Sequence, residues 1–236
     1  MKQIDWNKFT ITDNLLFQRV MRDKNLCKYL IEHILNIRIR DIQYLETEKT
    51  LSEQLGIPYY DDDIIRKASE QSAVGEQFFR AYDEKAGRNP LFFGQAKNVT
   101  GKPQVDANIT KPENLFRFEA ETIRTLASEG PCILIGRCSD FILESAEFEN
   151  FISLFVYCDL PDKIRRVIKV DGVESDEAIR RIQKINKQRR DYYRYYTGNN
   201  WGDPALYDLM LNTSHITIPQ SAELVKLYLR LRGFEL

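Results

Sequence analysis

The chain has 236 residues and a mass of 27.7 kDa, with 43% hydrophobic and 29% charged residues, which suits one or two globular domains with a buried core. Its 34 Lys and Arg residues nearly balance 35 Asp and Glu residues, so the net charge is −1. This balance excludes a general electrostatic attraction to nucleic acid or to an anionic membrane, and any phosphate site is therefore expected to be local.

Neither a membrane segment nor a metal site is predicted. No apolar run approaches the roughly 18 to 20 residues that cross a bilayer, and residues 1–12 contain no apolar signal core, so we expect a cytoplasmic protein. The two histidines, His33 and His215, lie at opposite ends of the chain without a nearby ligand pattern. Buried free thiols are expected at the cysteines, which lack the paired spacing of zinc ligands: Cys27, Cys132, Cys138 and Cys158.

The first elements predicted along the chain are helices and two short strands. Apolar residues recur at helical intervals over 12–34, and an approximate alternation over 37–44 predicts a half-buried strand. A short helix over 51–55 should end at Gly56, and residues 57–60 should form a short strand. Two weaker helices follow to about residue 85.

The middle of the chain predicts a long loop and then parallel strands. The stretch 87–111 has no sustained periodicity and should be a surface excursion of the kind that often forms a lid. A helix over 112–129 has one apolar side and ends at Gly130, and the apolar stretches 132–135 and 151–158 predict strands covered on both faces. Strands of this kind separated by helices indicate an α/β protein with a doubly wound parallel sheet and helices on both faces.

The long helix predicted over 175–196 is the most informative segment. Ser175 can cap it, and its first turn carries acidic residues that suit the helix dipole. A last strand over 207–211 and an amphipathic helix over 220–232 should close the fold. The helix divides into an apolar side, Ile179, Ile182, Ile185, Tyr192 and Tyr196, and a charged side, Arg180, Lys184, Lys187, Asp191 and Arg194.

Two interpretations of the charged side remain open. It can be a solvated helix face, or it can bind a polyphosphate with its cations and orient a sugar hydroxyl with its carboxylate. The preceding predicted helix adds Arg165, Arg166 and Lys169. The neighbouring tyrosines, from Tyr192 to Tyr196, favour core packing over base stacking.

Two dipeptides stand at the ends of predicted strands, where ligands collect in open α/β sheets. Gly136–Arg137 follows the strand 132–135, and Tyr60–Asp61 stands at the end of the strand 57–60. Each is equally compatible with a tight turn. The sequence contains no G-x-x-x-x-G-K-[ST] phosphate loop, since its nearest approximation, over 96–103, has Ala in place of the first Gly and Pro in place of the hydroxyl residue.

From residue 51 to the C-terminus the sequence resembles the cytidylate kinase-like family of P-loop kinases. The segments that carry the resemblance are 55–61, 133–138, 187–198, 201–204 and 207–213. The resemblance implies a P-loop nucleotide kinase-like sheet that holds ATP with Mg²⁺ and transfers the γ-phosphoryl group to a nucleoside monophosphate such as CMP. Here the first strand and the phosphate loop are replaced by another segment.

The resemblance also implies roles for individual residues. Arg137 matches the arginine that contacts the monophosphate nucleotide, and Asp191 with Arg194 matches an Asp-x-x-Arg that holds its sugar. The start of the lid corresponds to Lys163 and Arg166, and lid cations that reach the transferring phosphates correspond to Lys187 and Arg190. Cys138 stands where cytidylate kinases carry an aspartate that helps to recognise the base.

Residues 1–50 instead resemble the start of the PD-(D/E)XK nuclease-like transposase family, through residues 12–17, 23–24 and 39–50. We therefore expect an N-terminal unit over 1–50 and a cytidylate kinase-like domain over 51–236. The hypotheses are a kinase acting on ATP and a nucleoside monophosphate, and a non-catalytic nucleotide-binding or regulatory protein. Less favoured are a nucleic-acid-processing role, which the charge balance disfavours, and a recombined, poorly folding product.

Overall fold

The computed structural model describes residues 47–83, 96, 99–106 and 109–236, all of which lie in the compact unit Glu46–Leu236. The elements predicted over 12–34 and 37–44 lie outside the described residues, as do Cys27, His33 and much of the excursion over 87–111. Within the described ranges no helix is long and apolar enough to span a bilayer.

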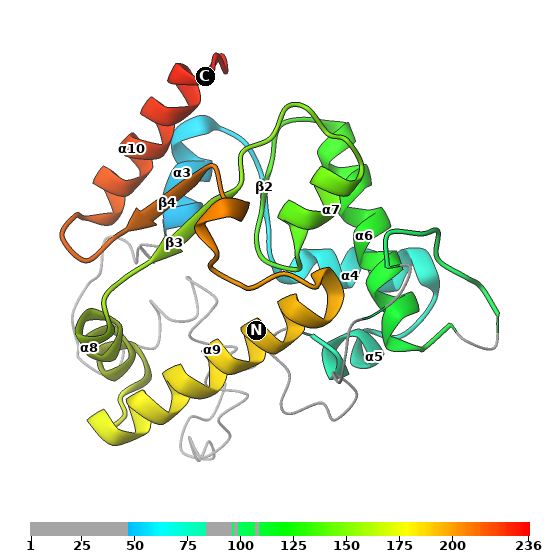
Figure 1. Ribbon diagram of the computed structural model, residues 1–236, viewed down its shortest axis with the longest axis horizontal. Coiled ribbons are helices and arrows are strands. Elements are labelled where there is room, and N and C mark those ends of the chain that lie inside the picture. Colours follow the sequence, from blue (N-terminus) through cyan, green and yellow to red (C-terminus); the bar gives the residue numbers. More distant parts are fainter. Residues whose placement is uncertain (1–46, 84–95, 97–98, 107–108) are drawn as a thin grey trace, which may run out of the picture. The chain divides into compact units, whose positions relative to one another are not determined.

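One to three helices separate successive short strands in the described ranges, and the strands pair in parallel, which agrees with the predicted α/β class (Figure 1). The elements are α3 (Thr47–Leu55), β1 (Tyr59–Tyr60), α4 (Asp62–Ser72), α5 (Glu76–Ala81), α6 (Pro112–Glu129), β2 (Ile133–Leu134), α7 (Ser139–Ser145), β3 (Leu154–Tyr157), α8 (Leu160–Asp171), α9 (Ser175–Thr197), the 3₁₀ turn η2 (Pro204–Leu206), β4 (Leu209–Asn212) and α10 (Ile218–Leu231).

The strands form two parallel pairs. Tyr59 of β1 lies opposite Ile133 of β2, and Leu154 of β3 lies opposite Leu209 of β4. Among the described residues these pairs are separate two-stranded sheets, where a single sheet was predicted. The strands are also shorter than expected, and Val156 of β3 is 42% exposed, so apolar composition alone overstated how far helices cover this strand.

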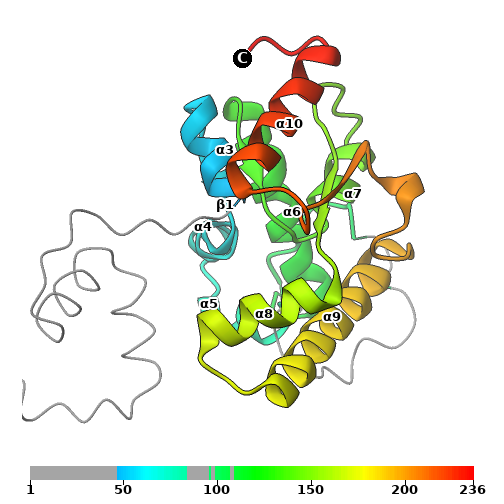
Figure 2. The same ribbon diagram turned by 90° about the vertical axis from the view of Figure 1, so that its left-hand side faces the viewer.

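One layer of helices is shared by both strand pairs. Leu51 of α3 and Ala222 of α10 are buried in one cluster, against which Ile133 of β2 and Leu154 of β3 pack. Figure 2 shows α3 beside α10. The two pairs therefore contribute to a common apolar cluster even though no ladder joins them.

The largest core cluster lies among α6, α7 and α9. Phe116 of α6 stacks on Tyr196 of α9 with ring centroids 4.0 Å apart, and Ile142 of α7 is fully buried beside them. Tyr192, Tyr193, Tyr195 and Tyr196 are all buried, which confirms core packing for this group. The helix 112–129 matches its prediction, because its apolar residues follow a strong helical period.

Two details of α9 differ from the predictions. Glu174, and not Ser175, occupies the N-cap position, although Asp176 and Glu177 do lie in the first turn. Ile182 is 5% exposed as expected, whereas Ile185 is 42% exposed. Helical periodicity placed both isoleucines on the core side, but it does not reveal how far along the helix the core extends.

We expect this difference to appear in stability. Ile182→Ala should lower the free energy of unfolding by about 2 to 5 kcal/mol, because it leaves a cavity in the core. Ile185→Ala, a matched control three residues along the same helix, should lower it by less than about 1 kcal/mol. Urea unfolding followed by circular dichroism measures both, and equal losses would contradict the placement of the core.

Candidate functional site

The carboxyl ends of β1 and β2 meet at one edge because the two strands are parallel. The N–H of Ile135 donates a hydrogen bond to the carbonyl of Tyr60 at 2.9 Å, so the residues that follow each strand begin side by side. Tyr60 is half-buried, with the Lys67 ammonium 5.9 Å from its ring centroid. The structure thus brings Asp61 and Gly136–Arg137 to the same edge.

The chain leaves β2 through a left-handed turn. Gly136, Arg137 and Cys138 have φ angles of 68°, 57° and 54°, and the N–H of Ser139 donates to the carbonyl of Gly136 at 3.0 Å. Each non-glycine residue in this conformation costs about 1 to 2 kcal/mol. Such strain persists only where the surroundings impose it, and it is concentrated at functional sites.

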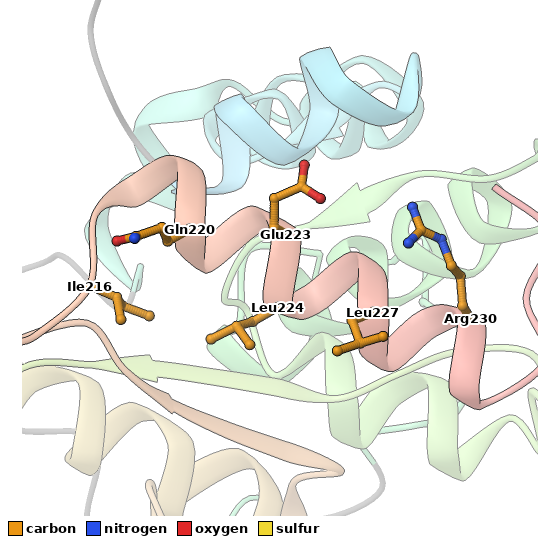
Figure 3. A pocket seen from close by; sticks show the side chains of 6 residues that line it. All are labelled: Ile216, Gln220, Glu223, Leu224, Leu227 and Arg230. Carbon is orange, nitrogen blue, oxygen red and sulfur yellow. The ribbon is translucent and has the colours of Figure 1, made fainter.

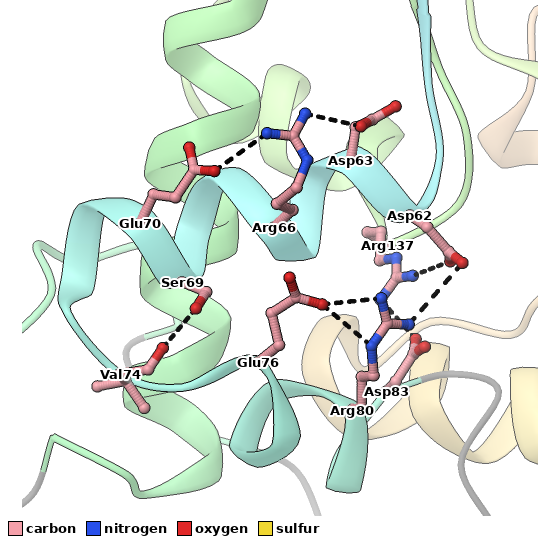
Figure 4. Close-up of polar contacts among 10 residues, drawn as sticks. All are labelled: Asp62, Asp63, Arg66, Ser69, Glu70, Val74, Glu76, Arg80, Asp83 and Arg137. Carbon is pink, nitrogen blue, oxygen red and sulfur yellow. Dashed lines mark hydrogen bonds and ion pairs between the residues drawn. The ribbon is translucent and has the colours of Figure 1, made fainter. Parts of the chain in front are cut away.

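The side chain of Arg137 ties this turn to its surroundings. This side chain is fully buried, and its guanidinium forms ion pairs with Asp83 at 2.5 Å and with Asp62 at 3.4 Å (Figure 4). Asp83 is 5% exposed, while Asp62 is more open and also lies 3.8 Å from Arg80. The arginine expected to contact a monophosphate is therefore already bound by carboxylates in this structure.

The C-terminal half of α9 lies next to this turn. The hydroxyl of Tyr192 lies 3.3 Å from the Glu119 carboxylate, and burial raises the pKa of Tyr192 well above its usual value. The negative charge of Glu119 also raises the pKa of Tyr192, whereas the positive charge of Arg137 lowers it. Cys138 of the turn lies in the same buried cluster as Tyr192 and Tyr193 of α9, while the adjacent Asp191 is exposed.

The charged side of α9 is solvent-exposed, as its spacing predicts. Lys187 and Asp191 form an ion pair at 2.5 Å, so the carboxylate expected to hold a sugar is engaged by a cation one turn away. Arg190 and Arg194 are exposed on the same helix.

The cations expected at the start of the lid lie on α8, which packs beside α9 (Figures 1 and 2). Lys163 is half-buried and Arg166 is exposed. None of the 12 residues of α8 is buried, although Leu160, Ile168 and other side chains along it are apolar. The two-helix unit of α8 and α9 thus carries both sets of predicted lid cations.

A second polar cluster lies at the carboxyl ends of β3 and β4, and sequence reasoning missed it. The Asn212 amide donates to Asp159 at 3.1 Å, and the N–H of Asp159 donates to the Ser214 hydroxyl at 2.7 Å. The exposed His215 lies 3.9 Å from Asp159. The only available signal was position after a strand, since the partners are more than 50 residues apart in the sequence.

Comparison with known proteins places these features in a family. Residues 48–215, which begin at α3 and extend past β4, match the Cytidylate kinase-like family. The chain belongs to the cytidylate kinase-like family. This result confirms the family assignment that the sequence resemblance predicted.

Named relatives agree with this assignment. The cytidylate kinase of Methanopyrus kandleri is 28% identical over 156 residues, which cover 64% of this chain and 75% of that protein. The cytidylate kinase of Pyrococcus horikoshii is 24% identical over 169 residues, or 70% of this chain and 71% of the relative. An uncharacterized protein from Eubacterium ventriosum shares the fold, with a TM-score of 0.58, 23% identity and coverage of 79% of this chain and 90% of that one.

This member of the cytidylate kinase-like family also contains a half-buried acid, Asp140, that the sequence did not indicate. The Tyr193 hydroxyl donates to Asp140 at 2.6 Å, and burial raises the pKa of Asp140 above its usual value. Burial also raises the pKa of the nearby Tyr207 to about 12. Within the described part of the chain, no group of three or more His, Cys, Asp and Glu side chains is arranged to hold a metal ion.

The buried ion pair leads to a stability prediction. Asp83→Ala leaves the Arg137 charge buried without its main counter-ion, and it should lower the free energy of unfolding by about 3 to 5 kcal/mol. Asp62→Ala removes a longer, more exposed contact and should cost less than about 1 kcal/mol. Urea unfolding of both variants tests this, and a larger loss for Asp62→Ala would show that the main partner is wrongly assigned.

Asp140 and Asp208 give opposite predictions for pH dependence. Because the pKa of Asp140 is raised in the folded state, the fold is more stable with Asp140 protonated than with it charged. The fold therefore has its full stability below the unfolded-state pKa of about 3.9 and loses part of it as the pH rises through the folded-state pKa. Asp140→Asn should therefore melt at a higher temperature than the parent chain near neutral pH, and this advantage should shrink towards about pH 4.

Asp208 is the control of opposite sign. Burial alone would raise its pKa, but hydrogen bonds from Ser153 and Arg232 lower it, so its stabilisation is present above the unfolded value and is lost on acidification. Asp208→Asn should melt at a lower temperature near neutral pH, with the difference vanishing in acid. Melting temperatures of both variants, measured from about pH 4 to neutral pH, test these two predictions. Shifts of the same sign for both variants would refute the opposite pKa directions assigned to Asp140 and Asp208.

Proposed function

We propose that this chain acts in the manner of a cytidylate kinase, transferring a phosphoryl group from ATP to a nucleoside monophosphate, at a rate limited by the lack of a Gly-rich phosphate loop. The observation that supports this most directly is the edge where Tyr60–Asp61 and Arg137 meet, next to the apolar cluster formed by the tyrosines of α9. Membership of the cytidylate kinase-like family supports the reaction class.

The proposed roles follow the geometry of that edge. Arg137 binds the phosphate of the monophosphate nucleotide, and Asp191 and Arg194 hold its sugar. The transferring phosphates are neutralised by exposed or half-exposed cations of the two-helix unit: Lys163, Arg166, Lys187 and Arg190. ATP would carry Mg²⁺ on its own phosphates, and such sites need one or two carboxylates. Asp61 can supply one at the end of β1, whereas the neighbouring Asp62 already pairs with Arg137 and Arg80.

We further propose that the two strand pairs are halves of one doubly wound sheet within a domain over 51–236, in a protein of the cytoplasm with an N-terminal unit over 1–50. The cluster shared by Ile133 of β2 and Leu154 of β3 under α3 and α10 supports a common sheet. In such a sheet the strand that precedes the phosphate loop in the family would lie between the two pairs, and no strand of the described residues lies there.

The missing loop sets the expected rate. Preorganised backbone N–H groups stabilise charge that develops in the transition state, and losing one such donor costs about 3 kcal/mol, or about 10²-fold in rate. Side-chain cations are flexible and cannot replace several fixed donors. Nucleotide binding should therefore survive better than phosphoryl transfer.

A non-catalytic nucleotide-binding protein is the second candidate, and the state of Arg137 favours it. Because Asp83 already neutralises this guanidinium in the interior, a phosphate has to displace a buried carboxylate before it can bind. A regulatory protein can accept slow or weak binding of that kind, whereas a fast enzyme cannot.

One pair of measurements separates the candidates. A coupled assay with ATP, Mg²⁺ and each nucleoside monophosphate in turn measures ADP release, and calorimetric titration with CMP and with ATP measures affinity. Acceptor-dependent ADP release supports the enzyme, and affinity without ADP release supports the binding protein. The absence of both would refute the proposed site.

Arg194→Ala tests the sugar site without disturbing the buried pair. Losing a charge-assisted hydrogen bond to the ligand should weaken monophosphate affinity, and any turnover, by about 10- to 100-fold. Arg181→Ala is the matched control, since Arg181 is an exposed cation of α9 bound to Glu177 and Asp171. The control should retain the parent affinity, and equal losses for both variants would indicate general electrostatic attraction.

A further inference from the structure

The outer side of α10 carries apolar side chains that nothing in the described structure covers. Ala222 and Val225 on the inner side are buried against α3, while Leu224, Leu227 and Leu231 are 43%, 49% and 77% exposed. Three neighbouring leucines at spacings of three and four form a continuous exposed ridge. Contiguous apolar surface of this kind marks a site of association.

This ridge borders an open groove of about 500 Å³. Its lining is formed by Ile216, Gln220, Glu223, Leu224, Leu227 and Arg230. Figure 3 shows Leu224 and Leu227 pointing to one side of α10, with Glu223 and Arg230 directed away from them. The surface therefore combines an apolar ridge with one acidic and one basic side chain along a flank.

The spacing of these residues is that of a short coiled-coil seam. Gln220, Leu224, Leu227 and Leu231 follow the alternating three- and four-residue spacing of heptad positions d, a, d and a, which puts both Glu223 and Arg230 at position g. In an antiparallel pair of helices, g positions of one helix face g positions of the other. Glu223 then meets Arg230 of a second copy, and the two-fold symmetry forms this ion pair twice.

We propose that α10 pairs antiparallel with α10 of a second copy of this chain. The charges select this orientation, because in a parallel pair Glu223 would face the e position, occupied by Tyr228, and no opposite charges would meet. Arg230 also has no ion pair within the described ranges, whereas Glu223, which is 58% exposed, forms an ion pair with Lys226 at 2.8 Å. The partner supplies the missing counter-charge.

The size of the surface sets the strength of the dimer. Two heptads bury less than the roughly 1,600 Å² of a standard interface, which places this contact among weak, reversible associations. Dimerisation should therefore appear at micromolar concentrations and above. None of its residues belongs to the candidate nucleotide site, so the failure of either proposal leaves the other standing.

Sedimentation velocity of the full chain over a wide concentration range provides the test. The average mass should rise from 27.7 kDa towards twice that value. Leu227→Asp should remain monomeric throughout, and circular dichroism should show it folded, because Leu227 is half-exposed. A parent chain that is monomeric at every concentration would overturn the proposal.

Charge exchange tests the orientation. Glu223→Arg and Arg230→Glu should each weaken dimerisation about tenfold, since each places like charges together twice. The double variant should recover the parent dissociation constant, and an equimolar mixture of the two single variants should form heterodimers. Single variants that dimerise like the parent chain, or a double variant that does not recover, would rule out the antiparallel pair.

Discussion

The structure around the candidate site depends on the buried ion pair between Arg137 and Asp83. It connects the strained turn after β2 to the end of α5, and through Asp62 to the first turn of α4. A buried charge without its partner is far more costly than the pair, so this contact fixes the position of all three segments. The guanidinium that secures the fold is also the one proposed to bind a nucleotide phosphate, and ligand and protein therefore compete for a single group.

Sequence patterns predicted the elements whose stability is local or strongly periodic. The helix that begins at Pro112 follows from a strict apolar period, and Tyr196 was correctly placed in the core. Ile185 was misplaced because periodicity identifies a side of a helix but not the length over which that side is covered. The apolar run over 132–135 predicted a longer strand than the observed β2. Apolar composition does not show where the partner strand ends, and the length of the partner limits the length of the pair.

The candidate site was only partly predictable for a related reason. Strand-end positions correctly indicated that Arg137 and Asp61 share an edge, and the family resemblance supplied the expected role of Arg137. The partner of Arg137, however, lies 54 residues away in the sequence, and that of Tyr193 lies 53 away. Contacts between such distant polar residues depend on how helices pack, and a single sequence carries no local signal for them.

The exposure of α8 has a consequence for the motions of the protein. Because none of its residues is buried, little apolar surface is gained or lost when it separates from α9. Segments with so few buried contacts open at low free energy, exchange their amide hydrogens early and are cut first by proteases. The cations of α8 are thus carried by a helix that has no buried residue, and a movement of this helix would change their electric field at the site.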